Sequence, residues 1–365
     1  MRKTASAASK GQIAILVADG LEGKGGIERI MLYLTRELAV RHPELETFIQ
    51  QTRFGPTQLI RHATTPLALA QFAARCAAGK VSLVHVNVAP RGSTWRKMLF
   101  AKVAKAAGVP VMLHLHGSGY DDYYAARSPS QQKKILDFFR EADGVVVLGD
   151  HWERFMRDTL GVDEARITVV ENGVPTPGGE ASPDSDPPTI VFMGAVGERK
   201  GVDVLIPALG KVAAAGIDFK ARIGGNGDLD HYKGLAKTAG IADKVEFLGW
   251  VGEEIVDREM RGADIFVLPS RAENQPVAII EAMARGLPVI STAIGAIPET
   301  VQDGTCGLIV PPGEVDPLAG AIETLAKDAA MRQRMGKAGR ARWKERYSIA
   351  AVADRMADRY RELIR

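Results

Sequence analysis

Short apolar runs alternate with stretches of helical pattern along nearly the whole chain, and this alternation limits the fold more than any other feature. Each run is strand-length and most are mainly apolar, which is typical of parallel strands covered on both faces. We expect strands over residues 13–17, 83–88, 111–115, 145–148 and 167–170, and again over 190–193, 220–223, 245–248, 265–268, 289–291 and 308–310. An α/β architecture built on parallel sheets follows.

A segment rich in Pro, Gly and Ser divides the chain in two. Residues 175–188 lack apolar periodicity and are predicted to be a linker. A length of 365 residues fits two domains. We therefore expect a disordered tail over 1–10, one Rossmann-like domain over 11–174, a second over 189–345 and a final helix over 346–365. Two such domains would place their ligand crevices at the carboxyl ends of their strands, facing a central cleft.

Composition argues against several classes of protein. No run of 18 or more apolar residues occurs, so no transmembrane helix is expected, and residues 1–10 lack the apolar core of a secretory signal. Cys76 and Cys306 give neither a disulfide framework nor metal-ligand spacing, which favours the cytoplasm. No DNA- or RNA-binding motif appears, so no nucleic-acid partner is expected.

The segment Glu273-Asn-Gln-Pro-Val-Ala-Ile-Ile-Glu281 follows the expected strand over 265–268 and crosses the start of a helix near Pro276. A helix N-terminus favours an anion such as a diphosphate. A carboxylate beside it can accept hydrogen bonds from two hydroxyls of a ribose or hexose. The alternative is two solvated glutamates flanking a surface helix.

Three other segments suggest ligand contact. The Gly20–Gly26 loop follows a strand, but it lacks both the dinucleotide and the P-loop spacing, and an ordinary βα loop is the alternative. His114 and His116 end a strand, and we expect them to point to opposite faces, with at most one beside a ligand and a structural role as the alternative. Lys200, at the head of a helix, could neutralise a diphosphate or be a solvated lysine.

Together these segments resemble the retaining glycosyltransferases of family 4, which have the GT-B fold. The resemblance covers nearly the whole chain and lies in seven segments in the family's order: 20–29, 114–117, 170–174, 192–201, 223–227, 273–281 and 295–304. One departure concerns Ala195, where the family usually has an arginine. Arg199 could replace that phosphate-binding cation only if it points into the cleft.

The resemblance implies a role for each matching residue. Glu281 would accept the ribose hydroxyls, Lys200 would hold the diphosphate and Glu273 would bind hydroxyls of the transferred sugar. His116 would lie near that sugar on the acceptor side. The remaining residues implied to bind the donor are Gly25, Gly26, Gly194, Arg199, Gly225, Asn274, Pro276, Val277, Ala278 and Ile279.

The implied reaction transfers a hexose from a UDP- or GDP-sugar to a saccharide or lipid-linked saccharide acceptor in bacterial surface polysaccharide synthesis. No cofactor is implied. No metal site is expected either, since Asp184-Ser-Asp186 lies in the predicted linker and is interpreted as solvated. Two alternatives stay open: a sugar-nucleotide epimerase of the same fold, and a non-catalytic subunit that binds a nucleotide sugar.

Two helices carry further expectations. Residues 95–105 combine Arg96, Lys97, Lys102 and Lys105 with Met98 and Leu99, and could form a patch against an anionic inner-membrane surface; a core-facing helix is the alternative. Residues 1–175 hold 23 Lys/Arg against 17 Asp/Glu, whereas 176–365 hold 24 against 27.

The last helix has an apolar stripe that predicts burial, at Val352, Met356, Tyr360 and Leu363. The resemblance implies that this helix packs on the first domain.

Overall fold

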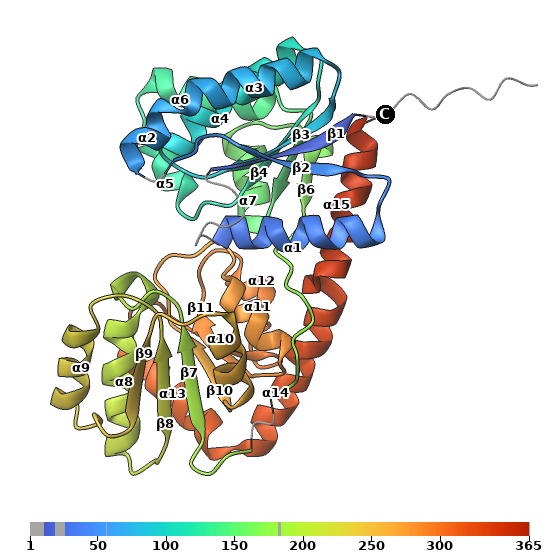
Figure 1. Ribbon diagram of the computed structural model, residues 1–365. Helices are drawn as coiled ribbons and strands as arrows, with labels where there is room; N and C mark the ends of the chain where they lie inside the picture. The colour runs from blue at the N-terminus through green and yellow to red at the C-terminus, as the bar shows by residue number, and fades with distance from the viewer. Residues whose placement is uncertain (1–10, 19–25, 56, 182–183, 365) are drawn as a thin grey trace, which may run out of the picture. The chain divides into compact units, whose positions relative to one another are not determined.

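The computed structural model describes residues 11–18, 26–55, 57–181 and 184–364. The chain forms two compact units (Figure 1). Unit 1 holds Met1–Glu171 and Val352–Arg365, and unit 2 holds Asn172–Ala351. Each is built on a parallel sheet flanked by helices, which confirms the predicted α/β class. The predicted tail over 1–10 lies outside the described residues.

Unit 1 contains a six-stranded sheet in the order β2-β1-β3-β4-β5-β6. Its strands are β1 (Gln12–Val17), β2 (Thr47–Gln51), β3 (Val81–Val88), β4 (Val111–Leu115), β5 (Gly144–Val147) and β6 (Ile167–Val169). Its α-helices are α1 (Gly26–Arg41), α2 (Gln58–Ala63), α3 (Thr65–Ala77), α4 (Gly92–Ala106), α5 (Tyr120–Ala125), α6 (Pro129–Arg140) and α7 (Asp150–Arg154). A π-helical turn η1 (Phe155–Thr159) and a 3-10 turn η2 (Glu164–Arg166) follow.

Unit 2 contains a second six-stranded sheet, in the order β12-β11-β10-β7-β8-β9. Its strands are β7 (Thr189–Met193), β8 (Lys220–Gly224), β9 (Val245–Gly249), β10 (Ile265–Leu268), β11 (Val289–Thr292) and β12 (Gly307–Val310). Its helices are η3 (Glu198–Lys200, 3-10), α8 (Val202–Ala214), α9 (Leu229–Thr238), α10 (Glu253–Arg261), α11 (Val277–Ala284), α12 (Ile297–Thr300), α13 (Val315–Lys327), α14 (Ala329–Arg342) and η4 (Trp343–Tyr347, π).

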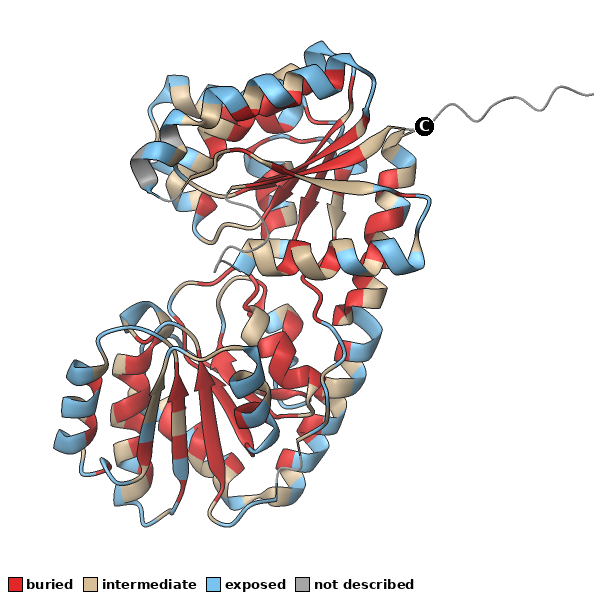
Figure 2. Ribbon diagram, viewed as in Figure 1, coloured by how far each residue is buried: buried red, intermediate tan, exposed pale blue. Residues whose placement is uncertain are grey.

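Burial explains why the central strands are apolar throughout. All residues of β4, β5, β7, β10 and β11 are buried, because helices cover both faces of each sheet (Figure 2). In each sheet the strand order reverses at one point, between β1 and β3 in unit 1 and between β7 and β10 in unit 2. The carboxyl edge at such a reversal is where open parallel sheets bind ligands.

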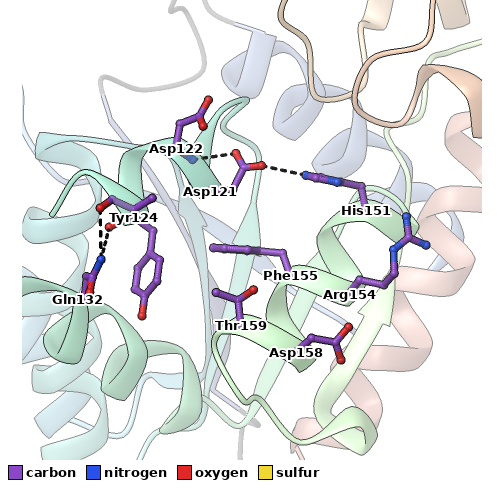
Figure 3. A pocket seen from close by; sticks show the side chains of 10 residues that line it. Asp121, Asp122, Tyr124, Gln132, His151, Arg154, Phe155, Asp158 and Thr159 are labelled. Atoms are coloured by element: carbon purple, nitrogen blue, oxygen red, sulfur yellow. Dashed lines mark hydrogen bonds and ion pairs between the residues drawn. The ribbon is translucent and has the colours of Figure 1, made fainter. Parts of the chain in front are cut away.

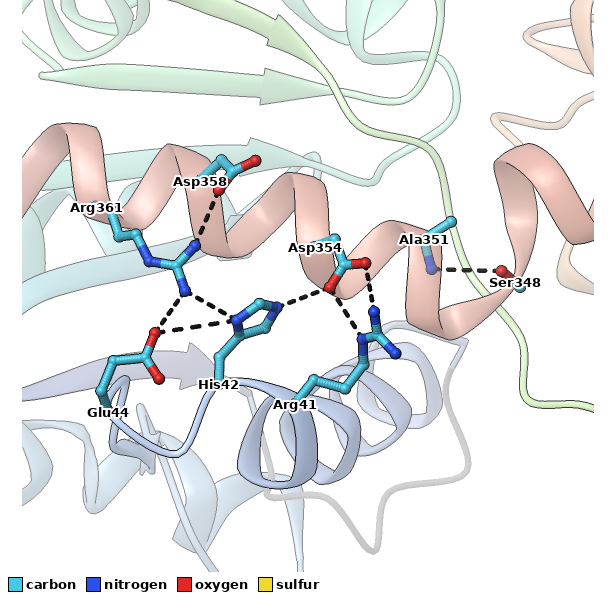
Figure 4. Close-up of polar contacts among 8 residues, drawn as sticks. All are labelled: Arg41, His42, Glu44, Ser348, Ala351, Asp354, Asp358 and Arg361. Carbon is cyan, nitrogen blue, oxygen red and sulfur yellow. Dashed lines mark hydrogen bonds and ion pairs between the residues drawn. The ribbon is translucent and has the colours of Figure 1, made fainter.

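Helix α15 (Ile349–Ile364) begins in unit 2 and belongs to unit 1 from Val352 onward. Val352, Met356 and Tyr360 are buried on its apolar stripe. On its polar side Asp354 accepts hydrogen bonds from Arg41 at 2.6 Å and contacts His42 at 2.8 Å (Figure 4). The charged face of the helix is therefore fixed to the end of α1, and Tyr360 on its apolar stripe contacts His85 of β3.

The structure bears on two further sequence expectations. Of the expected linker, residues 175–181 and 184–188 are described, and here the Ala181 N–H donates to the carbonyl of Arg285 and the Ser185 N–H donates to Asp264. The expected basic patch on α4 is wrong in part, because Lys97 is only 2% exposed and donates to the carbonyl of Asn87. Met98 is buried as well. Among the described residues, no helix combines the length and apolarity needed to cross a bilayer.

Candidate functional site

The loop between β10 and α11 lies at the point where the strand order of unit 2 reverses. Pro276 precedes α11 in an extended conformation, and no side chain caps the first turn of this helix. The Ile279 N–H donates to the carbonyl of Pro276, so the N–H groups of Val277 and Ala278 are the ones left without a partner within the helix at its partly positive end. Such a helix start favours an anion, as the sequence predicts.

Lys200 and Glu273 form a buried ion pair beside this helix start. Their side chains are 15% and 8% exposed, and Ser270 donates to the same carboxylate at 2.8 Å. Lys200 lies in the turn η3 and Glu273 in the loop after β10, so the pair joins the two strands at the reversal. Ser270 is a site residue that sequence analysis missed, since one serine after a strand carries no distinctive signal.

Arg199 and Arg271 fix the turn η3 against the loop after β10. The guanidinium of Arg271 pairs with Asp203 at 2.6 Å, and its backbone N–H donates to the carbonyl of Arg199 at 2.9 Å. The exposed Arg199 side chain donates to the carbonyl of Ala272 at 3.3 Å. Arg199 thus lies on the outside of the loop that carries Glu273.

Asn274 is only 6% exposed, and neither its Nδ2 nor its Oδ1 has a hydrogen-bond partner among the described residues. A buried amide without partners costs about 1–3 kcal/mol, so this side chain is suited to hydroxyl groups of a ligand. Gly295 packs closely against the backbone of this loop. A Cβ on Gly295 would come within 2.5 Å of the Glu273 and Asn274 carbonyl oxygens, and its φ is +55°.

Most of the other predicted donor contacts belong to unit 2. Gly194 donates its N–H to the carbonyl of Gly224 at 2.9 Å, and a Cβ on Gly225 would lie 1.7 Å from the Gly194 carbonyl oxygen. Glycine is therefore required where the two loops meet. On α11, Glu281 and Ile279 are buried, while Val277 and Ala278 are half-buried. Gly26 begins α1 in unit 1, and Gly25 lies outside the described residues.

Unit 1 carries a column of three histidines at the ends of β3 and β4. Tyr360 contacts Nδ1 of His85 at 2.7 Å, and Nε2 of His85 contacts Nδ1 of His114 at 3.1 Å. The rings of His114 and His116 lie 3.8 Å apart between centroids. The prediction of opposite faces is therefore wrong, because residues two apart in a strand share a face.

Asn87 on β3 is the second residue that sequence analysis missed. Its Oδ1 lies 2.8 Å from Nε2 of His116, and its Nδ2 donates to the carbonyl of Leu16 at 3.1 Å. A signal was present: His85 and Asn87 alternate with valines in β3, as His114 and His116 alternate around Leu115 at the end of the neighbouring strand.

Burial keeps the three histidines uncharged. It lowers the pKa of His85 to about 3, with Lys97 as a further cause. It also lowers the pKa of His114 and of His116 well below the ordinary value of 6.5. Neighbouring imidazoles add to both shifts, and Lys97 adds to that of His116. These side chains can donate or accept hydrogen bonds at neutral pH, but they do not carry charge.

An open pocket of about 620 Å³ lies between α5, α6, α7 and η1 of unit 1 (Figure 3). Tyr124 and Phe155 supply aromatic walls, with ring centroids 6.0 Å apart. Asp121 contacts His151 at 3.2 Å, and the lining also includes Asp122, Gln132, Arg154, Asp158 and Thr159. Aromatic faces beside polar groups suit the apolar and hydroxyl-bearing faces of a sugar.

No group of three or more His, Cys, Asp or Glu residues in the described part of the chain has the arrangement of a metal site. Asp184 and Asp186 are exposed on the surface segment before β7. The sequence prediction that the protein uses no metal stays a prediction.

Comparison with known proteins gives the same division of the chain. The model of the glycosyl transferase 4-like domain matches residues 25–173, and that of the glycosyl transferases group 1 matches residues 180–342. An alpha-D-kanosaminyltransferase from Streptomyces kanamyceticus is 25% identical over 72% of each chain. A GDP-mannose-dependent alpha-(1-6)-phosphatidylinositol monomannoside mannosyltransferase from Mycobacterium tuberculosis is 29% identical over 70% of each. The Anabaena protein HepE, solved with UDP, has a TM-score of 0.76 at 18% identity, covering 96% of this chain and 100% of that one.

Proposed function

This chain belongs to the glycosyltransferases, with a 4-like domain followed by a group 1 domain, and on that premise we propose that it transfers a hexose from a UDP- or GDP-sugar with retention of anomeric configuration. The acceptor is a saccharide or a lipid-linked saccharide of a bacterial surface polysaccharide. The observation that carries the proposal is the buried Lys200–Glu273 pair beside the uncapped start of α11. The Anabaena protein was solved in complex with UDP-glucose and the mycobacterial protein is named as GDP-mannose-dependent, and both support the donor class.

Each residue near the pair has a proposed task. Lys200 and the first N–H groups of α11 hold the diphosphate, and Arg199, which lies on the outside of the loop, adds no cation where Ala195 offers none. Glu273 and the unpartnered amide of Asn274 bind hydroxyls of the transferred sugar. Glu281 binds the ribose, and His116 lies on the acceptor side of the sugar.

The chemistry we propose needs no nucleophile from the protein. The bond from the anomeric carbon to the leaving phosphate breaks while the bond to the acceptor oxygen forms on the same face. The acceptor proton passes to the leaving phosphate oxygen. Lys200 stabilises the charge that grows on the diphosphate, which is the kind of preorganised electrostatic effect that lowers barriers most.

We assign the acceptor to unit 1 and favour the pocket lined by Tyr124 and Phe155 as its saccharide subsite. A panel of UDP- and GDP-sugars with saccharide acceptors tests the whole proposal, with product configuration read by NMR. One donor should give a product of unchanged anomeric configuration. Inversion would remove the retaining mechanism. Turnover of a nucleotide sugar without acceptor would favour an epimerase, and donor binding without turnover would favour a binding subunit.

We also infer weak contact between unit 1 and an anionic membrane surface. Leu99, Lys102 and Lys105 remain on the exposed face of α4, although Lys97 does not. A basic residue near such a surface contributes about 1 kcal/mol, screened by salt. Cosedimentation with phosphatidylglycerol vesicles at low salt should exceed that of a Lys102→Ser/Lys105→Ser variant. Equal binding by both proteins would leave α4 as a solvated face.

A further inference from the structure

The two hydrogen bonds of Asn87 fix the orientation of its side-chain amide. Its Nδ2 lies 3.1 Å from the backbone oxygen of Leu16, which can only accept, so the nitrogen belongs there. Its Oδ1 then faces Nε2 of His116 at 2.8 Å. Because an amide oxygen can only accept, Nε2 of His116 carries the proton of that hydrogen bond.

A neutral imidazole carries one proton, so Nδ1 of His116 presents a lone pair. The groups around this ring disfavour a second proton. His114 lies on β4, the strand that His116 follows, His85 lies on β3 and Lys97 on α4, and none of them supplies a carboxylate. Burial and these neighbours lower the pKa of His116 well below 6.5. The half-buried ring therefore offers an acceptor, and it offers no labile proton at neutral pH.

The histidine column has a proton arrangement of its own. If Tyr360 donates to Nδ1 of His85, Nε2–H of His85 donates to Nδ1 of His114, and only Nε2–H of His114 is left without a partner. The reverse direction leaves both that nitrogen and the Tyr360 hydroxyl proton unsatisfied. The first arrangement is favoured because each unsatisfied buried polar group costs about 1–3 kcal/mol. The column thus holds the His114 ring against His116. The tautomer of His116 is set by its hydrogen bond with Asn87.

We propose that Asn87 is a positioning residue that holds His116 as the Nε2–H tautomer, so that Nδ1 accepts a hydrogen bond from a sugar hydroxyl. The proposal rests on the proposed function for the place of His116 beside the sugar. It extends that function by giving His116 a fixed hydrogen-bonding role in place of proton transfer.

The Asn87→Asp variant tests the idea through pH. A carboxylate against Nε2 raises the pKa of His116, so a proton also occupies Nδ1 and the acceptor is lost. We expect kcat/KM to fall about tenfold at pH 7 and to recover as the pH rises past the new pKa. Tyr360→Phe is the matched control, because it breaks the far end of the column and leaves the Asn87–His116 contact intact. It should add no such pH dependence.

A second measurement keeps the test valid if Asn87→Asp is unstable. In wild type, ¹⁵N-imidazole NMR should show His116 protonated at Nε2 alone between about pH 5 and 8. Protonation at Nδ1, or titration in this range, would overturn the proposal. So would a pH-independent loss of activity that Asn87→Asp shares with Tyr360→Phe, which would indicate a structural role. If wild type transfers no sugar, the proposed function fails while the NMR result still decides the tautomer.

Discussion

The two units share a six-stranded parallel sheet, yet they bury opposite kinds of polar side chain where their strands end. Unit 2 buries a charged pair, Lys200 and Glu273, beside a helix start that is itself partly positive. Unit 1 buries His85 and His114 and half-buries His116, and it keeps all three neutral. The difference matches the two halves of the proposed reaction. A leaving diphosphate requires positive charge, whereas a sugar hydroxyl requires neutral hydrogen-bonding groups.

Removing the positive charge from unit 2 should have the largest effect. Lys200→Ala should remove about 3–4 kcal/mol of transition-state stabilisation and lower kcat accordingly. The loss of nucleotide affinity should be smaller. Steady-state kinetics and calorimetry measure the two quantities. Near wild-type turnover would remove Lys200 from the mechanism.

Stability must be separated from chemistry in that variant, because Glu273 would stay buried without its partner. Breaking a buried pair from one side costs about 3–5 kcal/mol, whereas replacing both partners is far less harmful. A Lys200→Met/Glu273→Gln variant is the matched control. It should unfold near the wild-type temperature and still fail to transfer sugar.

Lowering the pH should destabilise unit 1 more than unit 2. The folded pKa of each column histidine lies below its unfolded value of about 6.5, so the unfolded chain takes up protons first. The contribution of the neutral histidines to the free energy of unfolding is therefore complete above pH 6.5. As the pH decreases below this value, the free energy of unfolding falls by about 1.4 kcal/mol per pH unit for each histidine. Hydrogen exchange at pH 7 and pH 5.5 measures the two units separately.

Unit 2 serves as the internal control for the acid experiment, since its sequence contains a single histidine, the exposed His231. Opening of β3 and β4 should become easier at the lower pH, while β7 and β10 change less. Equal acid sensitivity of both units would contradict a neutral column in unit 1.

The sequence predicted the fold well, because central parallel strands are apolar runs with sharp ends. It missed β2, whose Thr47-Phe-Ile-Gln-Gln51 sequence is polar at an edge of the sheet. It also gave no sign of the π-helical turn over 155–159, which depends on tertiary packing.

The site was harder to predict, since it depends on partners far apart in sequence. Lys200 and Glu273 were predicted as separate ligand contacts, but their pairing is visible only in three dimensions. Lys97 reads as a surface lysine on a basic helix, yet the fold buries it against the carbonyl of Asn87. Asn87 itself stands outside the segments that carry the family resemblance.

The central claim is that donor recognition belongs to unit 2 and neutral hydroxyl recognition to unit 1. Calorimetric titration of wild type, Glu281→Gln and His116→Asn with UDP and GDP tests it most directly. Wild type and His116→Asn should bind the preferred nucleotide with similar Kd, and Glu281→Gln should lose about 1.5–3 kcal/mol through its weakened ribose contact. Equal loss in both variants, or unchanged affinity in Glu281→Gln, would contradict the account.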